Sequence, residues 1–94
     1  MNNKQKAKVL KILDLLQVNG PYVRLPYSEH LEDGIFEIRA KQSTNISRVL
    51  YFFAMDQKIV LTNGFVKKTQ KTPKREIDLA KKYRKDFEGR LRNE

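Results

Sequence analysis

The sequence predicts a single α+β domain in which helices pack against an antiparallel sheet. Three observations predict it: a helical apolar period near the N-terminus, three short strand-like segments in the middle, and a second helical period at the C-terminus. The expected order is therefore helix, loop, three strands and helix, with both helices packed against one face of the sheet. A chain of 94 residues is short enough to form one domain, which we expect to span residues 1–94.

The first helix is expected over residues 4–18. Four apolar residues share the spacing i, i+3, i+4, i+7, which places them on one helix face: Val9, Ile12, Leu13 and Leu16. Gly20-Pro21 is a stop signal that ends this helix. From residue 21 to residue 33 we expect irregular structure, because two prolines and scattered polar residues leave no sustained period.

Three strands are expected in the middle of the chain. Residues 35–41 alternate between an apolar set and a mostly charged set, directly after the turn pair Asp33-Gly34. A polar connection over residues 42–47 leads to residues 48–55, which are almost continuously apolar, as in a central strand buried on both faces. After a turn at residues 56–57, residues 58–63 form the third strand, which residues 65–66 extend past a bulge at Gly64. Tight connections favour an antiparallel meander.

The second helix is expected to begin at Thr72-Pro73. Threonine is a good N-cap residue, and proline is favoured at the first helical position. The inner face of this helix repeats at helical spacing and comprises Ile77, Ala80, Tyr83 or Arg84, Phe87 and Leu91.

Composition excludes several classes of function. The chain has no cysteine and one histidine, so a thiolate zinc site, a histidine-rich metal site and a Ser-His-Asp triad are unsupported, and we expect no cofactor. No apolar run is long enough to span a membrane, and no signal peptide is visible. We therefore expect a cytoplasmic protein without membrane contacts.

The positive charge of the chain favours an anionic partner. The formal net charge is +9, and residues 67–92 hold eleven basic and four acidic residues. The net charge alone permits a polyanion, an acidic protein or an anionic lipid surface. The densest run, residues 67–75, leads into a helix N-terminus, and it is either a phosphate cradle or a solvated basic loop.

Two arginines lie on the expected strands, where a buried guanidinium needs partners. Arg39 and Arg48 either form structural ion pairs, with Glu37 or Glu76 as the counter-ion, or face a polyanion on the open face of the sheet. Two further groups are interpreted as structural. His30 is taken as a surface or packing residue, and the acids at positions 29, 32 and 33 are taken as a solvated loop.

Three segments together resemble the phage-derived branch of the RelE/HigB toxin superfamily. They are Leu-Glu-Asp-Gly-Ile-Phe-Glu-Ile-Arg at residues 31–39, Arg-Val-Leu-Tyr-Phe-Phe at residues 48–53 and Gly-Phe-Val-Lys-Lys-Thr-Gln-Lys-Thr-Pro at residues 64–73. The resemblance covers roughly residues 10–85. It implies a RelE-like twisted antiparallel sheet of three or more strands, and a chain that lacks the N-terminal strand and first helix usual in that family.

The resemblance also implies a function. The protein would be the toxin of a type II toxin–antitoxin pair, a ribosome-dependent endoribonuclease that cleaves mRNA by 2′-hydroxyl attack without a metal ion. Its partners would be the ribosome with its mRNA and a HigA-like helix-turn-helix antitoxin, through which alone it would reach operator DNA.

The same resemblance assigns candidate site residues. The catalytic candidates are Arg39, Arg48, Lys67 and Lys68, with one of the two lysines as the group that transfers a proton. The RNA-binding candidates are Lys71, which is a weaker match to the family loop, and Lys74 and Arg75, which come from the basic run that leads into the helix N-terminus. Two other functions stay open: a ParE-like toxin that inhibits gyrase, and a basic RNA-binding module without enzymatic activity.

Overall fold

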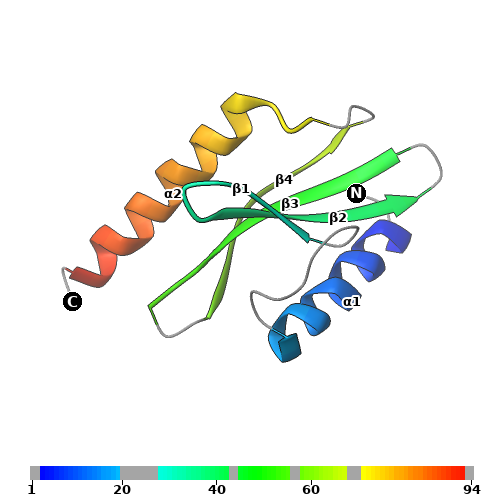
Figure 1. Cartoon of the computed structure of the whole chain (residues 1–94), viewed down its shortest axis with the longest axis horizontal. Helices are drawn as coiled ribbons and strands as arrows, with labels where there is room; N and C mark the ends of the chain where they lie inside the picture. The colour runs from blue at the N-terminus through cyan, green and yellow to red at the C-terminus, as the bar shows by residue number, and fades with distance from the viewer. Residues whose placement is uncertain (1–2, 20–27, 43–44, 56–57, 68–70, 93–94) are drawn as a thin grey trace.

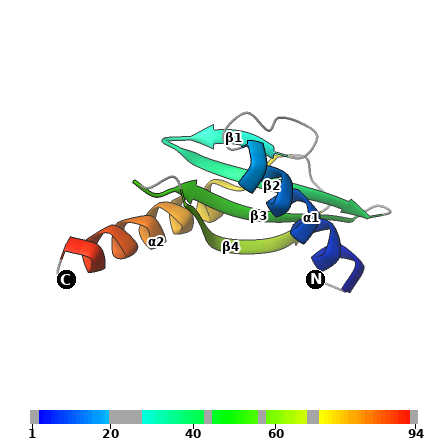
Figure 2. The ribbon, with the colours of Figure 1, turned by 90° about the horizontal axis from the view of Figure 1, so that it is seen from below.

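A computed structural model describes residues 3–19, 28–42, 45–55, 58–67 and 71–92 of the chain. The elements are α1 (Asn3–Asn19), β1 (Ser28–Glu32), β2 (Ile35–Gln42), β3 (Asn45–Phe53), β4 (Ile59–Lys67) and α2 (Lys74–Arg92). Figure 2 shows the four strands as one antiparallel sheet in the order β1-β2-β3-β4. The predicted α+β class, the antiparallel meander and the C-terminal helix are confirmed.

The two helices cover opposite faces of the sheet (Figure 1). One cluster joins α1 to Ile38 and Tyr51, and the other joins Ala80 of α2 to Ile35 and Leu50. Successive residues of a strand point to opposite faces, so these two clusters lie on opposite sides of β2 and β3. The prediction that both helices pack on one face is therefore wrong. Because residues 49–52 of β3 are buried on both faces, each face needs its own cover.

The first helix has the predicted apolar face. Val9, Ile12 and Leu16 are buried against the sheet, and Leu13 is partly buried beside them. None of the described helices is long and apolar enough to cross a membrane.

β1 is a strand that the sequence analysis did not predict. Its residues show no apolar alternation, and its place depends on pairing with β2 across the Asp33-Gly34 turn. Both turn residues have positive φ, 49° at Asp33 and 77° at Gly34, as a type I′ hairpin requires. A hydrogen bond of 2.5 Å between the Ser28 hydroxyl and the Tyr51 hydroxyl ties β1 to the core. The rest of the expected irregular segment, residues 21–27, lies outside the described residues.

The other strand boundaries shift by a few residues. β2 runs to Gln42 and β3 begins at Asn45, so the connection is shorter than the predicted polar segment. The register of β3 with β4 shifts by one residue between Val49 and Tyr51, which confirms the bulge expected near Gly64. The turn expected at residues 56–57 lies outside the described residues.

Candidate functional site

A buried ion pair lies on the face of the sheet that α2 covers. The side chains of Glu37 and Arg48 are both fully buried, and Arg48 Nη1 donates to Glu37 Oε1 at 2.7 Å. Of the two counter-ions that the sequence allowed, the structure has Glu37. Glu76 instead accepts a hydrogen bond of 3.0 Å from Asn63 Nδ2.

The Glu37 carboxylate also binds two further groups. Arg39 Nε donates to Oε1 at 2.8 Å, and the Thr72 hydroxyl donates to Oε2. Arg48 Nη1 donates a second bond to the Thr72 hydroxyl at 3.3 Å. One carboxylate thus connects β2, β3 and the segment before α2. A buried charge is tolerated when its remaining hydrogen-bonding capacity is used in this way.

The predicted N-cap role of Thr72 is wrong. The first bonds of α2 go to the carbonyl of Pro73, which accepts from the Glu76 N–H at 3.0 Å and the Ile77 N–H at 3.4 Å. The Thr72 hydroxyl is engaged by a residue 35 positions earlier in the chain. The N-cap rule considers local bonds only, and so it could not find this partner.

A pocket of about 420 Å³ opens beside the Glu37 network. The guanidinium of Arg39, with a side chain 25% exposed, contributes one positive charge, and Lys71 contributes another. Arg39 Nη2 lies 3.6 Å from Glu29 Oε2, so an anion entering here competes with that carboxylate. The lining residues are Glu29, His30, Leu31, Glu32, Arg39, Lys71, Thr72 and Ile77.

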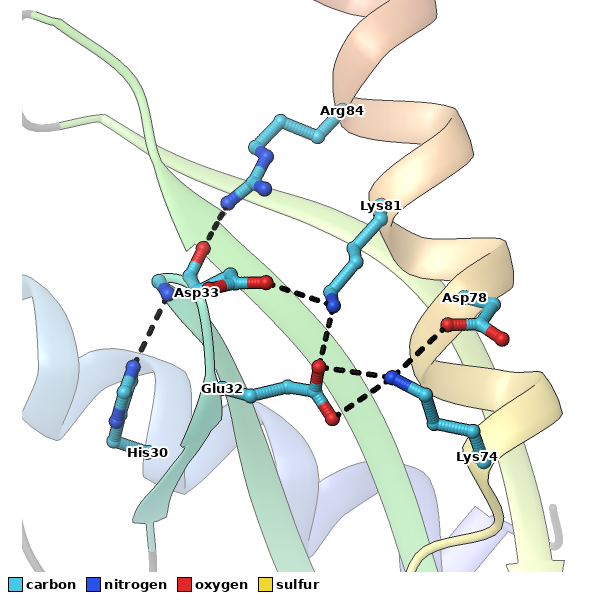
Figure 3. Close-up of polar contacts among 8 residues, drawn as sticks. His30, Glu32, Asp33, Lys74, Asp78, Lys81 and Arg84 are labelled. Carbon is cyan, nitrogen blue, oxygen red and sulfur yellow. Dashed lines mark hydrogen bonds and ion pairs between the residues drawn. The ribbon is translucent and has the colours of Figure 1, made fainter.

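A second ionic cluster fastens the β1–β2 turn to α2 (Figure 3). Glu32 accepts from Lys74 Nζ at 2.9 Å and from Lys81 Nζ, and Asp33 Oδ2 lies 2.9 Å from Lys81 Nζ. The guanidinium of Arg84 donates to the Asp33 carbonyl. The interpretation of these acids as a solvated loop is partly wrong: the side chain of Glu32 is partly exposed and that of Asp33 is exposed, but Glu32 lies in β1 and both acids are ion-paired to α2. Arg84 rather than Tyr83 faces the sheet.

These contacts shift the acid–base behaviour of the cluster. The hydrogen bond from Lys81, followed by that from Lys74, lowers the pKa of Glu32 from its ordinary 4.5 to about 2. Lys81 likewise holds the pKa of Asp33 below its usual value. Glu32 in turn raises the pKa of Lys74 and of Lys81 above the ordinary lysine value.

The histidine is a packing residue, as the sequence analysis interpreted it. Its ring meets the Phe36 ring edge-on, with centroids 4.9 Å apart, and its Nε2 accepts the Gly34 N–H at 3.1 Å. Phe36 packs against the α1 cluster, on the face opposite Arg39. Within the described part of the chain, no group of three His, Cys, Asp or Glu side chains could hold a metal ion.

Residues 1–85 match the sequence model of a family described as phage derived protein Gp49-like (DUF891). The chain belongs to this Gp49-like family. The family is toxin-like and related to the RelE and HigB toxins, and the four-strand sheet with its C-terminal helix is consistent with a RelE-like fold. A search of curated proteins finds no match to the chain.

The Gp49-like fold brings together some of the predicted catalytic residues. Arg39 lies at the pocket, and Arg48 lies beneath it with no surface to offer a substrate. Lys67 ends β4 opposite Ile46, two residues after Phe65, the neighbour of Arg48 in the sheet. The side chain of Lys67 and the whole of Lys68 lie outside what the structure describes. The catalytic roles of these four residues stay predictions.

The three predicted RNA-binding residues lie close in sequence at the start of α2 but have different surroundings. Lys71 lines the pocket. Lys74 is held by Glu32 and, at 3.3 Å, by Asp78. Arg75 is exposed on the first turn of the helix. Glu29 and Thr72 also line the pocket and were not predicted as site residues, because β1 and the contact between Thr72 and Glu37 leave no local signal in the sequence.

Replacing Arg48 by methionine should strongly destabilise the Gp49-like domain, because it leaves the charge of Glu37 buried without its main partner. We expect the free energy of unfolding in urea to fall by about 3–5 kcal/mol. Adding Glu37→Met should recover part of that loss, since it removes the unpaired buried charge, while the Thr72 hydroxyl loses its acceptor. A double variant no more stable than Arg48→Met would contradict the assignment.

The Glu32 cluster should make stability depend on pH in the acid range. Because the pKa of Glu32 is lowered on folding, its contribution is fully present above pH 4.5 and is lost as the pH falls toward about 2. High salt should weaken the effect, since these charges are exposed. The measurement is the urea midpoint across that range for the wild-type protein and Glu32→Gln. If the urea midpoint depends on pH in the same way in both proteins, Glu32 contributes nothing to the acid dependence of stability.

Proposed function

We propose that this protein is the toxin of a type II toxin–antitoxin pair and that it cleaves mRNA on the ribosome. The observation that carries the proposal is the pocket in which Arg39 and Lys71 lie on one face of the sheet, in a chain that belongs to a toxin-like family. An RNA backbone supplies the regularly spaced negative charge that such a pair of cations attracts.

The contacts of Arg39 suit it to bind a phosphate group. Its Nε is bonded to Glu37, which fixes the plane of the guanidinium, while Nη2 points toward the weaker contact with Glu29. A guanidinium presents paired N–H donors that match phosphate oxygens. A phosphate oxygen that displaces Glu29 would therefore meet an already oriented donor. Lys71 adds a second positive charge to the same pocket.

The proposed reaction is attack of the RNA 2′-oxygen on the adjacent phosphorus. The bond from phosphorus to the 5′-oxygen breaks, a 2′,3′-cyclic phosphate forms, and the 2′-hydroxyl proton and a proton for the 5′-oxygen are exchanged with protein groups or water. Negative charge grows on the phosphoryl oxygens in the transition state, and fixed cations stabilise it. We assign this role to Arg39 and Lys71, and the proton transfer to Lys67 or Lys68. Arg48 would contribute indirectly, because its ion pair holds Glu37, and Glu37 orients Arg39.

The proposal includes the expected partners. The toxin would act in the cytoplasm on ribosome-bound mRNA, and a HigA-like helix-turn-helix antitoxin would neutralise it. Operator DNA would be bound by the antitoxin, and no membrane or cofactor takes part.

A non-enzymatic RNA-binding module is the second candidate. It is favoured by the burial of Arg48, which removes one of the four predicted catalytic cations from the surface. The ParE-like function has no comparable observation in its favour, and a DNA supercoiling assay with purified gyrase separates it from the other two.

The test is mRNA cleavage in a reconstituted translation reaction, with the cut positions mapped by primer extension. Arg39→Ala should lower the cleavage rate by about 10²–10³-fold, the usual cost of losing one donor to a transition-state oxyanion. Arg90→Ala is the matched control, because it removes an exposed arginine at the other end of α2, and it should keep the wild-type rate.

Three results would overturn parts of this account. Wild-type protein that binds RNA without cutting it would favour the second candidate. Gyrase inhibition without cleavage would favour the ParE-like function. Equal rates for Arg39→Ala and the wild-type protein would remove Arg39 from the site.

A further inference from the structure

The hydroxyl of Thr72 both donates and accepts a hydrogen bond inside the protein. It donates to Glu37 Oε2 and accepts from Arg48 Nη1, and the residue is only 7% exposed. The single hydroxyl proton goes to Glu37, and one of the two lone pairs of the oxygen accepts from Arg48. Since Pro73 accepts the first bonds of α2, capping does not account for a buried threonine here.

The position of Thr72 in the chain gives this contact a consequence for the pocket. Lys71 precedes it, and Pro73 follows it at the start of α2 with a fixed φ. The bond to Glu37 therefore anchors the point at which the chain leaves the basic segment and enters the helix. Lys71, Thr72 and Arg39 all line the same pocket.

We propose that Thr72 is a positioning residue: by binding Glu37 it places Lys71 beside Arg39, so that both cations contact the RNA backbone together. This inference rests on the proposed function, because it takes RNA as the ligand of the pocket. The Glu37 carboxylate binds Arg39 through Nε and also binds Thr72, the neighbour of Lys71. One buried group therefore fixes the positions of both cations.

The test is a double-mutant cycle on binding, which does not require catalysis. The probe is a single-stranded oligonucleotide with 2′-deoxyribose throughout, because without a 2′-hydroxyl it cannot be cleaved. Lys71→Ala should weaken binding by roughly three- to tenfold and reduce the salt slope by about 0.7, the value for one lost phosphate contact. Thr72→Val removes the hydroxyl but keeps the shape, and it should produce a similar loss.

The combined variant decides whether Thr72 acts through Lys71. We expect Lys71→Ala with Thr72→Val to bind no more weakly than the worse single variant, because both remove the same contact. Thr72→Ser keeps the hydroxyl, and its dissociation constant should lie within about twofold of the wild-type value. Losses that multiply in the double variant, or an unchanged Thr72→Val, would overturn the proposal.

A stability control separates positioning from general loss of structure. Ile12→Val weakens the α1 cluster on the opposite face of the sheet, and it should leave oligonucleotide binding unchanged while lowering the urea midpoint. Equal loss of binding in Ile12→Val and Thr72→Val would show that Thr72 matters only for stability.

The outcomes also separate this inference from the nuclease proposal. Wild-type protein that shows the non-additive binding pattern but does not cleave RNA would retain the positioning role and overturn the nuclease. Wild-type protein that cleaves RNA, together with binding losses that multiply in the double variant, would retain the nuclease and overturn the positioning role. No binding of the oligonucleotide by the wild-type protein would overturn the positioning role, whereas the nuclease proposal is overturned only by the absence of cleavage in the translation reaction.

Discussion

A carboxylate that is removed from water needs positive charge beside it, and the buried Glu37 carboxylate is such a group on the face of the sheet that α2 covers. Arg48 donates to Glu37 from the next strand, and Arg39 donates from two residues further along the same strand. Thr72 donates a third hydrogen bond from the segment before α2. The sheet, the start of the second helix and the pocket are therefore arranged around one buried group. Removing Arg48 leaves the buried Glu37 with only Arg39 and Thr72 beside it, and removing Glu37 takes the ion-pair partner from the buried Arg48, so the members of the network depend on one another.

The arrangement of the helices follows from the same sheet. β3 is buried on both faces, so α1 covers one and α2 covers the other. α2 covers the face that also carries Glu37 and the two arginines, and it leaves Arg39 partly exposed at its N-terminal end. The pocket is thus the place where a buried ionic layer reaches the surface. Glu32 and Asp33 pin the β1–β2 turn to α2, which closes one side of that pocket.

Local patterns predicted most of the fold and only part of the candidate site. The apolar stripe of α1, the alternation in β2 and the bulge near Gly64 depend on near neighbours, and these predictions were confirmed. β1 was missed because its stability comes from pairing with β2 and from ion pairs to α2, not from its own pattern. The bond between Thr72 and Glu37 spans 35 residues, so no local rule could find it. Glu37 itself was among the candidate counter-ions, because a buried arginine must have one.

The central claim is that Glu37 orients the Arg39 guanidinium, so that its Nη2 can exchange the carboxylate of Glu29 for a phosphate. The most direct measurement is NMR of the arginine Nε–H groups, with and without the uncleavable oligonucleotide. The account predicts that the Arg39 Nε–H exchanges slowly with water, that its signal moves on binding, and that the signal of the buried Arg48 stays in place. The exposed Arg75 provides the reference for fast exchange. An Arg39 Nε–H that exchanges with water as fast as that of Arg75, or whose signal does not move when the oligonucleotide is added, would contradict this claim.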